Sequence, residues 1–544
     1  ISQIRSDARV LVVPTADANL RGREARLQRF KELGASILFF SASFIPVVGE
    51  VLFTVTWLQL ISSVYHGFAA WSRGDSDQAL NELLDVMDTV ALGLATAGAI
   101  KTAGFTATLV KVQLKNRSWR LWSPDLTPYR SPHELPEGLA ANAQGLYEHN
   151  QRHYLKLGKD VLHQVKRDPQ TQQWHVEHPL SEAAYTPALL TNGVGTWRHA
   201  HEAVKNWDEL TLLTRVGPDA LHIDQPAFEP ILQVSEVNIE QLRHVHQDMV
   251  RPPPRLRDTL KHFNFEQEIN QFTMARAEGI TVSAHSPLIQ LHLLGSLPEW
   301  PATTVLKILD PKQNTIMSFG AQGTEISISE EQLRKGELLQ VLEQKLPANV
   351  FEALAHTDSI PDEAKPYFTP VSRLASRLSE EAAQHKQRIF TWLCEYSEKP
   401  VTPIEKQLSE IIPLLTKSQL EEISAVLGEL EQSRVLREKS LTAEQRWEVD
   451  QYVRQSETLR IREGLYLDSV STPESLCMLL FTLEQLPGWP ASHRIEIRDQ
   501  RFDGNLLGRA GPANTGTLHV LTREGELYGL FSSAGVRLKE PADL

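Results

Sequence analysis

Paired histidines are the first residues whose types and spacing could support chemistry. His199 and His201, and likewise His244 and His246, are two residues apart, while His175 and His178 are three apart. A spacing of two puts both rings on one face only in a β-strand, and none of these pairs matches the helical zincin pattern His-Glu-x-x-His. Because the chain has 19 histidines, accidental pairs are expected. We therefore predict surface or hydrogen-bonded histidines, with no metal ligand and no cofactor.

Cys394 and Cys477 are the only candidates for thiol catalysis. A catalytic cysteine is an exposed thiolate near a histidine, an arginine or a helix N-terminus. Cys394 follows the apolar run 389–393 and Cys477 precedes the apolar run 478–481, so we expect both to be inert thiols on buried helix faces. Two cysteines cannot build a disulfide framework, which is typical of a protein made in a reducing cytoplasm.

Glycine-rich segments offer no complete phosphate site. Gly511 and Gly516 have the spacing of a P-loop, yet Thr517 stands where the loop needs lysine, and a strand pattern follows instead of a helix. The run Asn192–Trp197 contains Gly-x-Gly without a third glycine, which indicates a turn. A Gly-x-Ser-x-Gly elbow is absent as well. The sequence therefore predicts no catalytic residue.

A duplicated motif dominates the second half of the chain. Leu-Pro-Glu-Trp-Pro at 297–301 returns as Leu-Pro-Gly-Trp-Pro at 486–490, an offset of 489 − 300 = 189 residues, and each copy stands between a leucine-rich run and a strand-like run. The prolines fix the direction in which Trp300 and Trp489 are presented. We predict that each indole is a plug between a helix and a sheet; if exposed, both would mark a partner-binding site.

The patterns predict a multidomain α+β protein, since 544 residues exceed a single core. We predict a helical domain at residues 1–115 and a β-rich module at 116–250, with a hairpin at 158–160. A helical segment is predicted at 361–470. Two duplicated helix-plus-sheet modules, at 251–360 and 471–544, flank that segment. Ser418-x-x-Glu421 and Thr442-x-x-Gln445 match the capping box that begins a helix, and Gly464 is expected to end one.

The most apolar stretch, 35–65, contains Glu50 as its only charged residue and is interrupted at Pro46 and Gly49. Each half is shorter than the ~20 residues that cross a bilayer as one helix, so a helical hairpin within a bundle is the first interpretation. The alternative is membrane insertion by residues 35–100, which would require Glu50 to be protonated or paired inside lipid.

Charge excludes one class of partner. The formal net charge is −13, which opposes attachment to nucleic acid. The chain begins with Ile1 and has no basic-then-apolar leader, which favours an internal piece of a longer protein.

Several runs, in this order, resemble the dermonecrotic-toxin-like domain of very large Gram-negative bacterial proteins and the region that follows it. The runs are Val13–Asp17, Phe44–Glu50, Gly67–Trp71, Trp122–Tyr129, Arg251–Pro253, Gly464–Leu467 and the motif at 486–490. The resemblance implies a secreted virulence factor or effector; many such proteins continue into leucine-rich repeats and a ubiquitin-ligase domain with a Cys-x-Asp nucleophile. Here Tyr396 and Leu479 stand where that aspartate would follow Cys394 and Cys477, so the ligase role is not carried over. No Cys/His pair can be matched to a deamidase either.

These observations lead to a functional hypothesis. The fragment is expected to be a non-catalytic scaffold or delivery segment of a secreted bacterial toxin or effector, made in the cytoplasm and able to act in a host cell, that binds a host or bacterial protein. The alternatives are the membrane-inserting segment at 35–100 and a toxin enzyme of unrecorded type.

Overall fold

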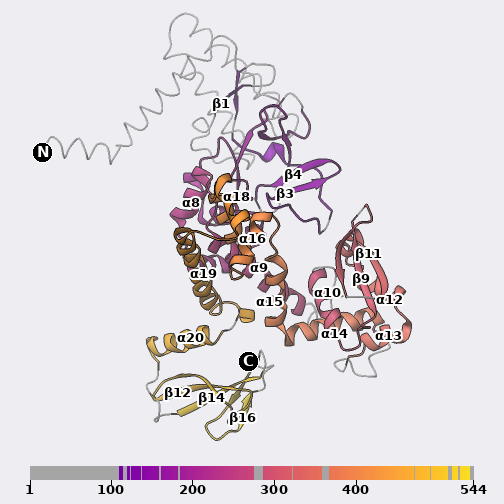
Figure 1. Cartoon of the computed structure of the whole chain (residues 1–544), viewed down its shortest axis with the longest axis vertical. Helices are drawn as coiled ribbons and strands as arrows, with labels where there is room; N and C mark the ends of the chain where they lie inside the picture. Colours follow the sequence, from indigo (N-terminus) through magenta and orange to yellow (C-terminus); the bar gives the residue numbers. More distant parts are fainter. Residues whose placement is uncertain are drawn as a thin grey trace, which may run out of the picture. The chain divides into compact units, whose positions relative to one another are not determined.

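The computed structural model describes Val110 to Lys539, apart from gaps at 114–118, 123, 137, 159–160, 182–183, 275–285, 311, 321–322, 358–366, 471, 490–491, 513–516 and 525–526. The apolar hairpin expected within 35–100, with Pro46, Gly49 and Glu50, lies outside the described residues. Two compact units divide at Trp207, and residues 135–140 belong to the second unit. Together the described elements make a multidomain α+β fold (Figure 1).

The described part of the first unit contains a short pair of strands followed by a six-stranded antiparallel meander. Strands β1 (Val110–Gln113) and β2 (Trp119–Trp122) pair across residue 115, where the sequence predicts a domain boundary. The meander follows chain order through β3 (Leu146–His149), β4 (Arg152–Lys156), β5 (Leu162–Arg167), β6 (Trp174–Val176), β7 (Ala188–Thr191) and β8 (Trp197–His199). The predicted hairpin at 158–160 is confirmed, because Lys156 pairs with Leu162 across it.

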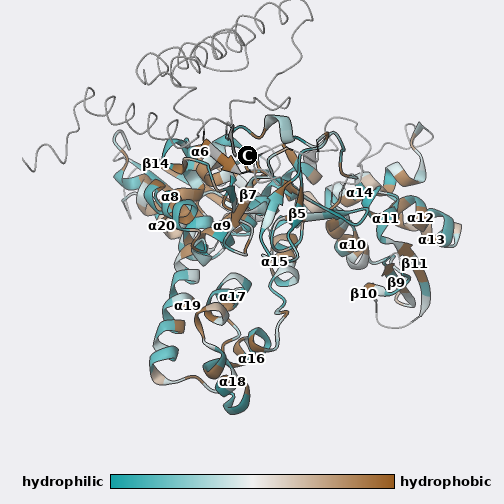
Figure 2. Cartoon of the chain, turned by 90° about the horizontal axis from the view of Figure 1, so that it is seen from above, coloured by the Kyte–Doolittle hydropathy of each residue, from teal (hydrophilic) through white to brown (hydrophobic). Residues whose placement is uncertain are grey.

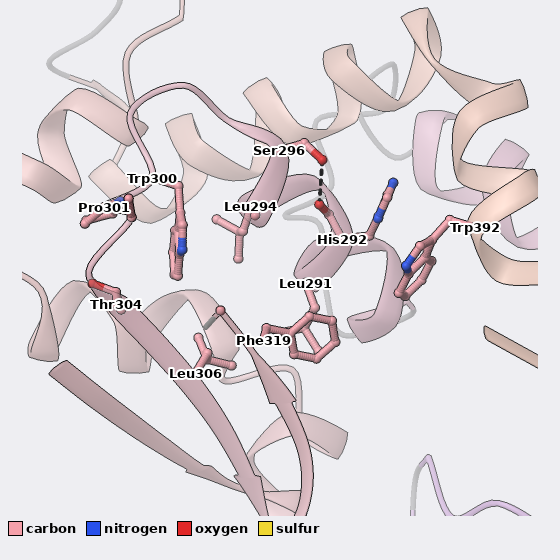
Figure 3. Close-up of a pocket in the computed structure, with 13 residues that line it drawn as sticks. Leu291, His292, Leu294, Ser296, Trp300, Pro301, Thr304, Leu306, Phe319 and Trp392 are labelled. Atoms are coloured by element: carbon pink, nitrogen blue, oxygen red, sulfur yellow. Dashed lines mark hydrogen bonds between the residues drawn. The ribbon is translucent and has the colours of Figure 1, made fainter. Parts of the chain in front are cut away.

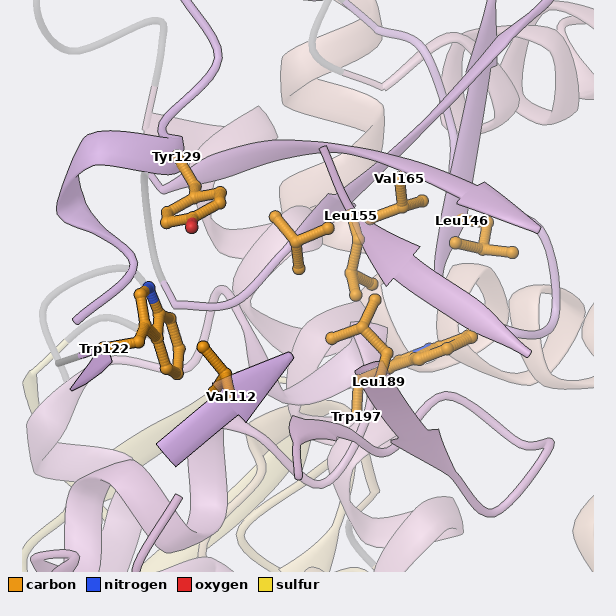
Figure 4. Close-up of a cluster of buried hydrophobic side chains, with 9 residues drawn as sticks. Val112, Trp122, Tyr129, Leu146, Leu155, Val165, Leu189 and Trp197 are labelled. Carbon is orange, nitrogen blue, oxygen red and sulfur yellow. The ribbon is translucent and has the colours of Figure 1, made fainter. Parts of the chain in front are cut away.

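Large rings and branched side chains fill the core of this meander, as Figure 4 shows for Trp122, Tyr129 and Trp197 around Leu155 and Leu189. Alternate residues of a strand face the same side, so each short strand contributes only one or two of them. Their polar atoms are paired. The Tyr129 hydroxyl donates to the carbonyl of Tyr185 over 2.7 Å, and the Trp197 indole N–H donates to the carbonyl of Gln144 over 2.6 Å. Buried polar groups of this kind stabilise a core only when they find a partner.

The last strand of the meander ends at His199, so the β-rich module, which the sequence predicts to extend to residue 250, is shorter than expected. Helices follow instead: η3 (Val204–Asn206), α6 (Glu209–Thr214), η4 (Pro218–Ala220), η5 (Gln225–Ala227), α7 (Phe228–Ser235) and α8 (Ile239–Asp248). Side chains cap the N-termini of two of these helices, α6 and α8. Asp208 accepts a hydrogen bond from the Thr211 amide over 2.7 Å, and Asn238 forms a capping box with Gln241.

Helix α9 (Pro254–Met274) is the centre of the second unit. It contacts α7, α14 (Pro370–Gln384), α15 (Lys386–Ser397), α17 (Lys417–Val426) and α19 (Ala443–Glu463). Because neighbours surround it, its buried residues lie on several faces instead of one stripe: Pro254, Leu256, Asp258, Thr259, Leu260, His262, Phe263, Glu266, Ile269 and Phe272.

The predicted helical segment continues through α16 (Pro403–Ile411) and α18 (Glu429–Glu438), with Leu408 and Leu420 in its core. Helix α19 is mostly hydrophilic, as its teal colour in Figure 2 shows. The capping box of Thr442 with Gln445 is confirmed. The box predicted at Ser418 is wrong, since α17 begins two residues earlier with Thr416 as its cap and Gln419 as its partner.

Glu421 cannot complete the predicted box because its carboxylate pairs with Arg257 on α9 and with Lys417. Two overlapping matches to one motif occur within six residues here, and tertiary ion pairing selects between them.

The two duplicated modules have the same topology. The first module contains α10 (Pro287–Ser296), β9 (Thr304–Leu309), β10 (Thr315–Phe319) and β11 (Thr324–Ser329); the second contains α20 (Pro473–Gln485), β12 (His493–Asp499), β13 (Leu506–Ala510), β14 (Thr517–Glu524), β15 (Leu527–Phe531) and β16 (Arg537–Lys539). In both, the first strand lies between the second and the third; it pairs antiparallel with the second and parallel with the third. Helices α11 (Glu330–Arg334), α12 (Leu338–Lys345) and α13 (Ala348–Leu354) follow the first sheet.

The offset of 189 residues aligns the ends of the two helices, Ser296 and Gln485. Leu297 and Leu486 then have the same backbone angles, φ −68° and ψ 135°. In each copy the tryptophan amide closes a turn by donating to the leucine carbonyl, over 3.0 Å at Trp300 and 3.1 Å at Trp489. None of the helices in the described part of the chain combines the length and apolar composition needed to cross a bilayer.

Gly464 ends α19 as predicted, but for a reason of space. Its φ of −64° suits any residue. A Cβ atom there would lie 2.6 Å from Ser475 Cβ and 2.8 Å from the carbonyl oxygen of Val470, in the 3-10 turn η7 (Asp468–Val470). Glycine is therefore required because α20 and the 3-10 turn approach the end of α19 closely.

We expect Gly464→Ala to lower the free energy of unfolding by about 1–3 kcal/mol, the usual cost of overpacking. Urea unfolding followed by circular dichroism measures it. Gly295→Ala is the matched control, because a Cβ atom on this helical glycine meets nothing within 4 Å and should be neutral or stabilising by up to about 1 kcal/mol. Equal losses in both variants would contradict the packing explanation.

Candidate functional site

The histidine pairs of the sequence are structural. His199 and His201 follow one another at the end of β8, and both rings pack on Trp122, with centroids 5.6 and 5.7 Å from it. His201 Nε2 lies 3.0 Å from the Tyr185 hydroxyl, and burial lowers the pKa of His201. Among the residues that the structure describes, no group of three or more His, Cys, Asp or Glu side chains is placed to hold a metal ion.

His244 and His246 lie on helix α8, where a spacing of two turns the side chains away from each other. His246 is buried and its Nε2 lies 2.7 Å from the carbonyl oxygen of Leu212, while the exposed His244 has its Nδ1 2.6 Å from Asp248. The pair cannot act together on one ligand.

A cysteine, a histidine and a glutamate do come together, through residues that are far apart in the sequence. His262 Nδ1 on α9 lies 2.7 Å from Glu463 Oε1 at the end of α19, and the Cys394 thiol of α15 interacts with the same ring. A thiol beside an imidazole that is oriented by a carboxylate is the arrangement of nucleophilic cysteine catalysis. All three residues are nevertheless buried, with exposures of 3%, 4% and 0% for Cys394, His262 and Glu463.

Burial decides what this cluster does. It would by itself lower the pKa of His262, but the Glu463 carboxylate and the Cys394 thiol outweigh it and raise the pKa to about 10. The imidazolium is thus held as one half of a buried ion pair. A nucleophile must reach its substrate, and this one is sealed between helices. The cluster therefore fastens α9 to α15 and α19, and the expectation that Cys394 is a buried thiol is confirmed.

Cys477 differs from its prediction because it is exposed. It lies on α20, whose buried residues Leu476 and Leu480 pack toward the sheet of the second module. The apolar run 478–481 fits a buried helix as well as a helix with one face uncovered, so sequence alone could not separate the two.

An open pocket of about 300 Å³ lies beside Trp300 in the first module. Its lining comes from α10, from the tryptophan turn, from the edge of β9 and β10, and from α15. Figure 3 shows Trp300 at one end and His292 with Trp392 at the other, with Leu294, Leu291 and Phe319 between them. Trp300 is half-buried, so its indole forms a wall of the pocket as well as packing between helix and sheet.

His292 is the one titratable residue among those that line this pocket. Its ring stacks on Trp392 with centroids 4.5 Å apart and an interplanar angle of 22°. Burial, with the charge of Arg388, lowers the pKa of His292, so the imidazole is neutral at pH 7. Nε2 is buried and makes no hydrogen bond to a described residue. The pocket thus offers apolar rings, the neutral imidazole of His292 and the hydroxyl-bearing residues Ser296 and Thr304, with no acid–base pair.

Sequence reasoning found Trp300 and missed His292 and Trp392. One signal was available: the offset of 189 aligns His292 with Phe481, so both copies carry a ring at that helix position. Trp392 has no such signal, because only the packing of α15 brings it to α10. Trp489, also half-buried, packs against the core of the second module with Leu483 and Leu507.

Comparisons of the chain with protein-family models, with curated proteins and with solved structures find no match.

The two thiols should differ sharply in reactivity. In the native protein, DTNB should modify Cys477 rapidly and Cys394 only after unfolding, because a thiol must be accessible to react. Cys477→Ser should remove the rapid phase, and Cys394→Ser, the matched control, should leave it intact. A rapid phase that survives Cys477→Ser would show that the buried cluster opens.

The buried imidazolium should make stability depend on pH. A pKa raised from 6.5 to about 10 means that the folded protein keeps a proton that the unfolded chain releases. The contribution of the His262 imidazolium to the free energy of unfolding is complete below about pH 6.5 and is lost as the pH rises to about 10. In the native protein, the urea concentration at the midpoint of unfolding should decrease as the pH is raised from 6 to 10. In the Glu463→Gln variant, it should decrease less. His244→Gln, at an exposed histidine, should keep the native slope; an unchanged slope in Glu463→Gln would contradict the ion pair.

Proposed function

We propose that this chain is a non-catalytic scaffold segment of a large secreted bacterial toxin or effector, and that its first module binds an aromatic side chain of a partner protein beside Trp300. The pocket carries the proposal. It has the character of small-ligand sites, which are mostly apolar with few polar groups, and its volume of about 300 Å³ is at the small end of their range. A single side chain fits such a volume better than a cofactor does.

The lining favours a ring that carries a polar edge. Trp300, Phe319 and Trp392 provide faces and edges for aromatic packing, which contributes about 0.5–1.5 kcal/mol per pair beyond area burial. A buried nitrogen without a partner, such as His292 Nε2, costs about 1–3 kcal/mol. The hydroxyl of tyrosine or the N–H of tryptophan would remove that cost. Partner-binding tyrosine and tryptophan residues are frequent at the centres of protein interfaces.

The enzyme alternative has weaker support. Its only thiol–imidazole–carboxylate cluster in the described part of the chain is buried. The one serine that lines the pocket, Ser296, donates its hydroxyl to the backbone carbonyl of His292 over 2.9 Å instead of to a base, and His292 is the only titratable residue there. The membrane alternative concerns residues 35–100, which lie outside the described residues.

Titration of the chain with N-acetyl-tryptophanamide tests the pocket. In protein labelled with 5-fluorotryptophan, the resonances of Trp300 and Trp392, assigned from Trp300→Phe and Trp392→Phe, should shift in ¹⁹F spectra while most of the other nine of the 11 tryptophans stay unchanged. Gly295→Leu should abolish the shift, since a side chain there extends into open space at the pocket wall.

Gly295→Ala is the control that should keep binding. Shifts spread over tryptophans elsewhere, or retained in Gly295→Leu, would contradict the pocket. Turnover of any substrate that is lost on Cys394→Ser would instead support the enzyme alternative.

A further inference from the structure

The duplicated modules expose the same helix face to different degrees. In the first module the outward face of α10 is covered: Ile289, Gln290 and Leu293 have exposures of 0%, 2% and 1%. With the offset of 189, the equivalent residues of α20 are Met478, Leu479 and Thr482; the first two are 42% and 43% exposed, and Thr482 is exposed as well. Phe481, the equivalent of His292, is 67% exposed.

The first module shows what covers this face. Helix α14 packs on α10, and Trp392 of α15 stacks on His292. An ion pair completes the contact: Arg377 Nη2 of α14 lies 2.8 Å from Glu299 Oε2 in the tryptophan turn. The occupant of the face is therefore an amphipathic helical pair that supplies an apolar stripe, an aromatic ring and a basic side chain.

The exposed face of α20 matches the apolar part of this chemistry. The equivalent of Glu299 is Gly488, so the acidic group of this face is instead Glu474, in the first turn of the helix. Cys477, Met478 and Phe481 lie on one side of the helix at the spacing of adjacent turns, and Leu486 continues the apolar surface at 50% exposure. Glu474 precedes this stripe by one turn, and α20 contains no basic residue. A helix face on which aromatic, leucine and methionine side chains are exposed together is typical of an interaction surface, because leaving these side chains in water is unfavourable.

We infer that the outward face of α20 is a docking site for an amphipathic helix of a partner protein, which presents an aromatic ring to Phe481 and a lysine or arginine to Glu474. The contact repeats, between two proteins, the apolar and aromatic part of the one that α14 and α15 make with α10 inside this chain, with the ion pair moved to the first turn of the helix. It is independent of the pocket beside Trp300. The negative charge of the chain, −13, favours a basic helix over a second copy of the same chain.

A library of displayed three-helix scaffolds, randomised on one helix face, supplies the probe. Selection against the full chain should enrich aromatic and leucine residues three or four apart, with lysine or arginine nearby. Purified binders should lose at least about tenfold in affinity on Phe481→Glu and on Met478→Glu, since truncating or charging a central ring removes much of an interface's energy. Bound helix should also protect Cys477 from DTNB.

Two controls separate this result from others. Leu430→Glu places the same charge at a leucine that is 88% exposed on α18 and should leave binding unchanged. Gly295→Leu should also leave it unchanged, whereas binders sensitive to Gly295→Leu and not to Phe481→Glu would support the pocket and overturn the α20 site. A concentration-dependent dimer in sedimentation, lost on Phe481→Glu, would overturn the partner helix in favour of a second copy. Failure to select any Phe481-dependent binder would overturn the inference as well.

Discussion

The buried ion pair between His262 and Glu463 is the constraint on which the second unit depends. It joins the middle of α9 to the last turn of α19, through two residues that are 201 positions apart in the sequence. Neighbouring contacts on α9 follow the same rule: Asp258 accepts from the Thr416 hydroxyl over 2.7 Å, and Glu266 accepts from the Ser469 amide over 3.2 Å. Removing one partner of a buried pair leaves an uncompensated charge and costs about 3–5 kcal/mol. Polar residues therefore select this arrangement of helices around α9, although apolar burial supplies the bulk of the free energy.

That arrangement determines what each duplicated module can offer. Fixing α15 against α9 carries Trp392 to His292, which closes one side of the pocket and covers α10. Fixing the end of α19 places the first turn of α20 beside Gly464, which allows the close approach of Ser475, but no described helix covers Met478 and Phe481 as α14 and α15 cover α10. Two copies of one helix–turn–sheet unit thus have different surfaces because their neighbours differ, while the tryptophan turn and the pairing of the first three strands stay the same.

The cluster of Cys394, His262 and Glu463 shows why residue types in a catalytic order do not define an enzyme. In an open cleft, the same imidazole–carboxylate contact would orient a catalytic base. Here it holds helices together, because three helices exclude solvent and substrate from it. Binding surfaces are the better guide to what this chain does. The two surfaces that we propose for binding, the Trp300 pocket and the outward face of α20, are places where apolar groups remain in contact with water at a cost.

Local sequence determined much of the architecture: the alternating strands of the meander, the capping box at Thr442, and the repeat of the tryptophan turn, because hydrophobic period, caps and proline turns act within a few residues. It could not place the helices at 209–248, choose between Thr416 and Ser418 as the start of α17, or show that Cys477, unlike Cys394, is exposed. Those outcomes depend on partners far away in the chain, such as Arg257 for Glu421 and Trp392 for His292. Periodicity tells which face of an element is apolar, and only the tertiary structure decides whether that face is covered.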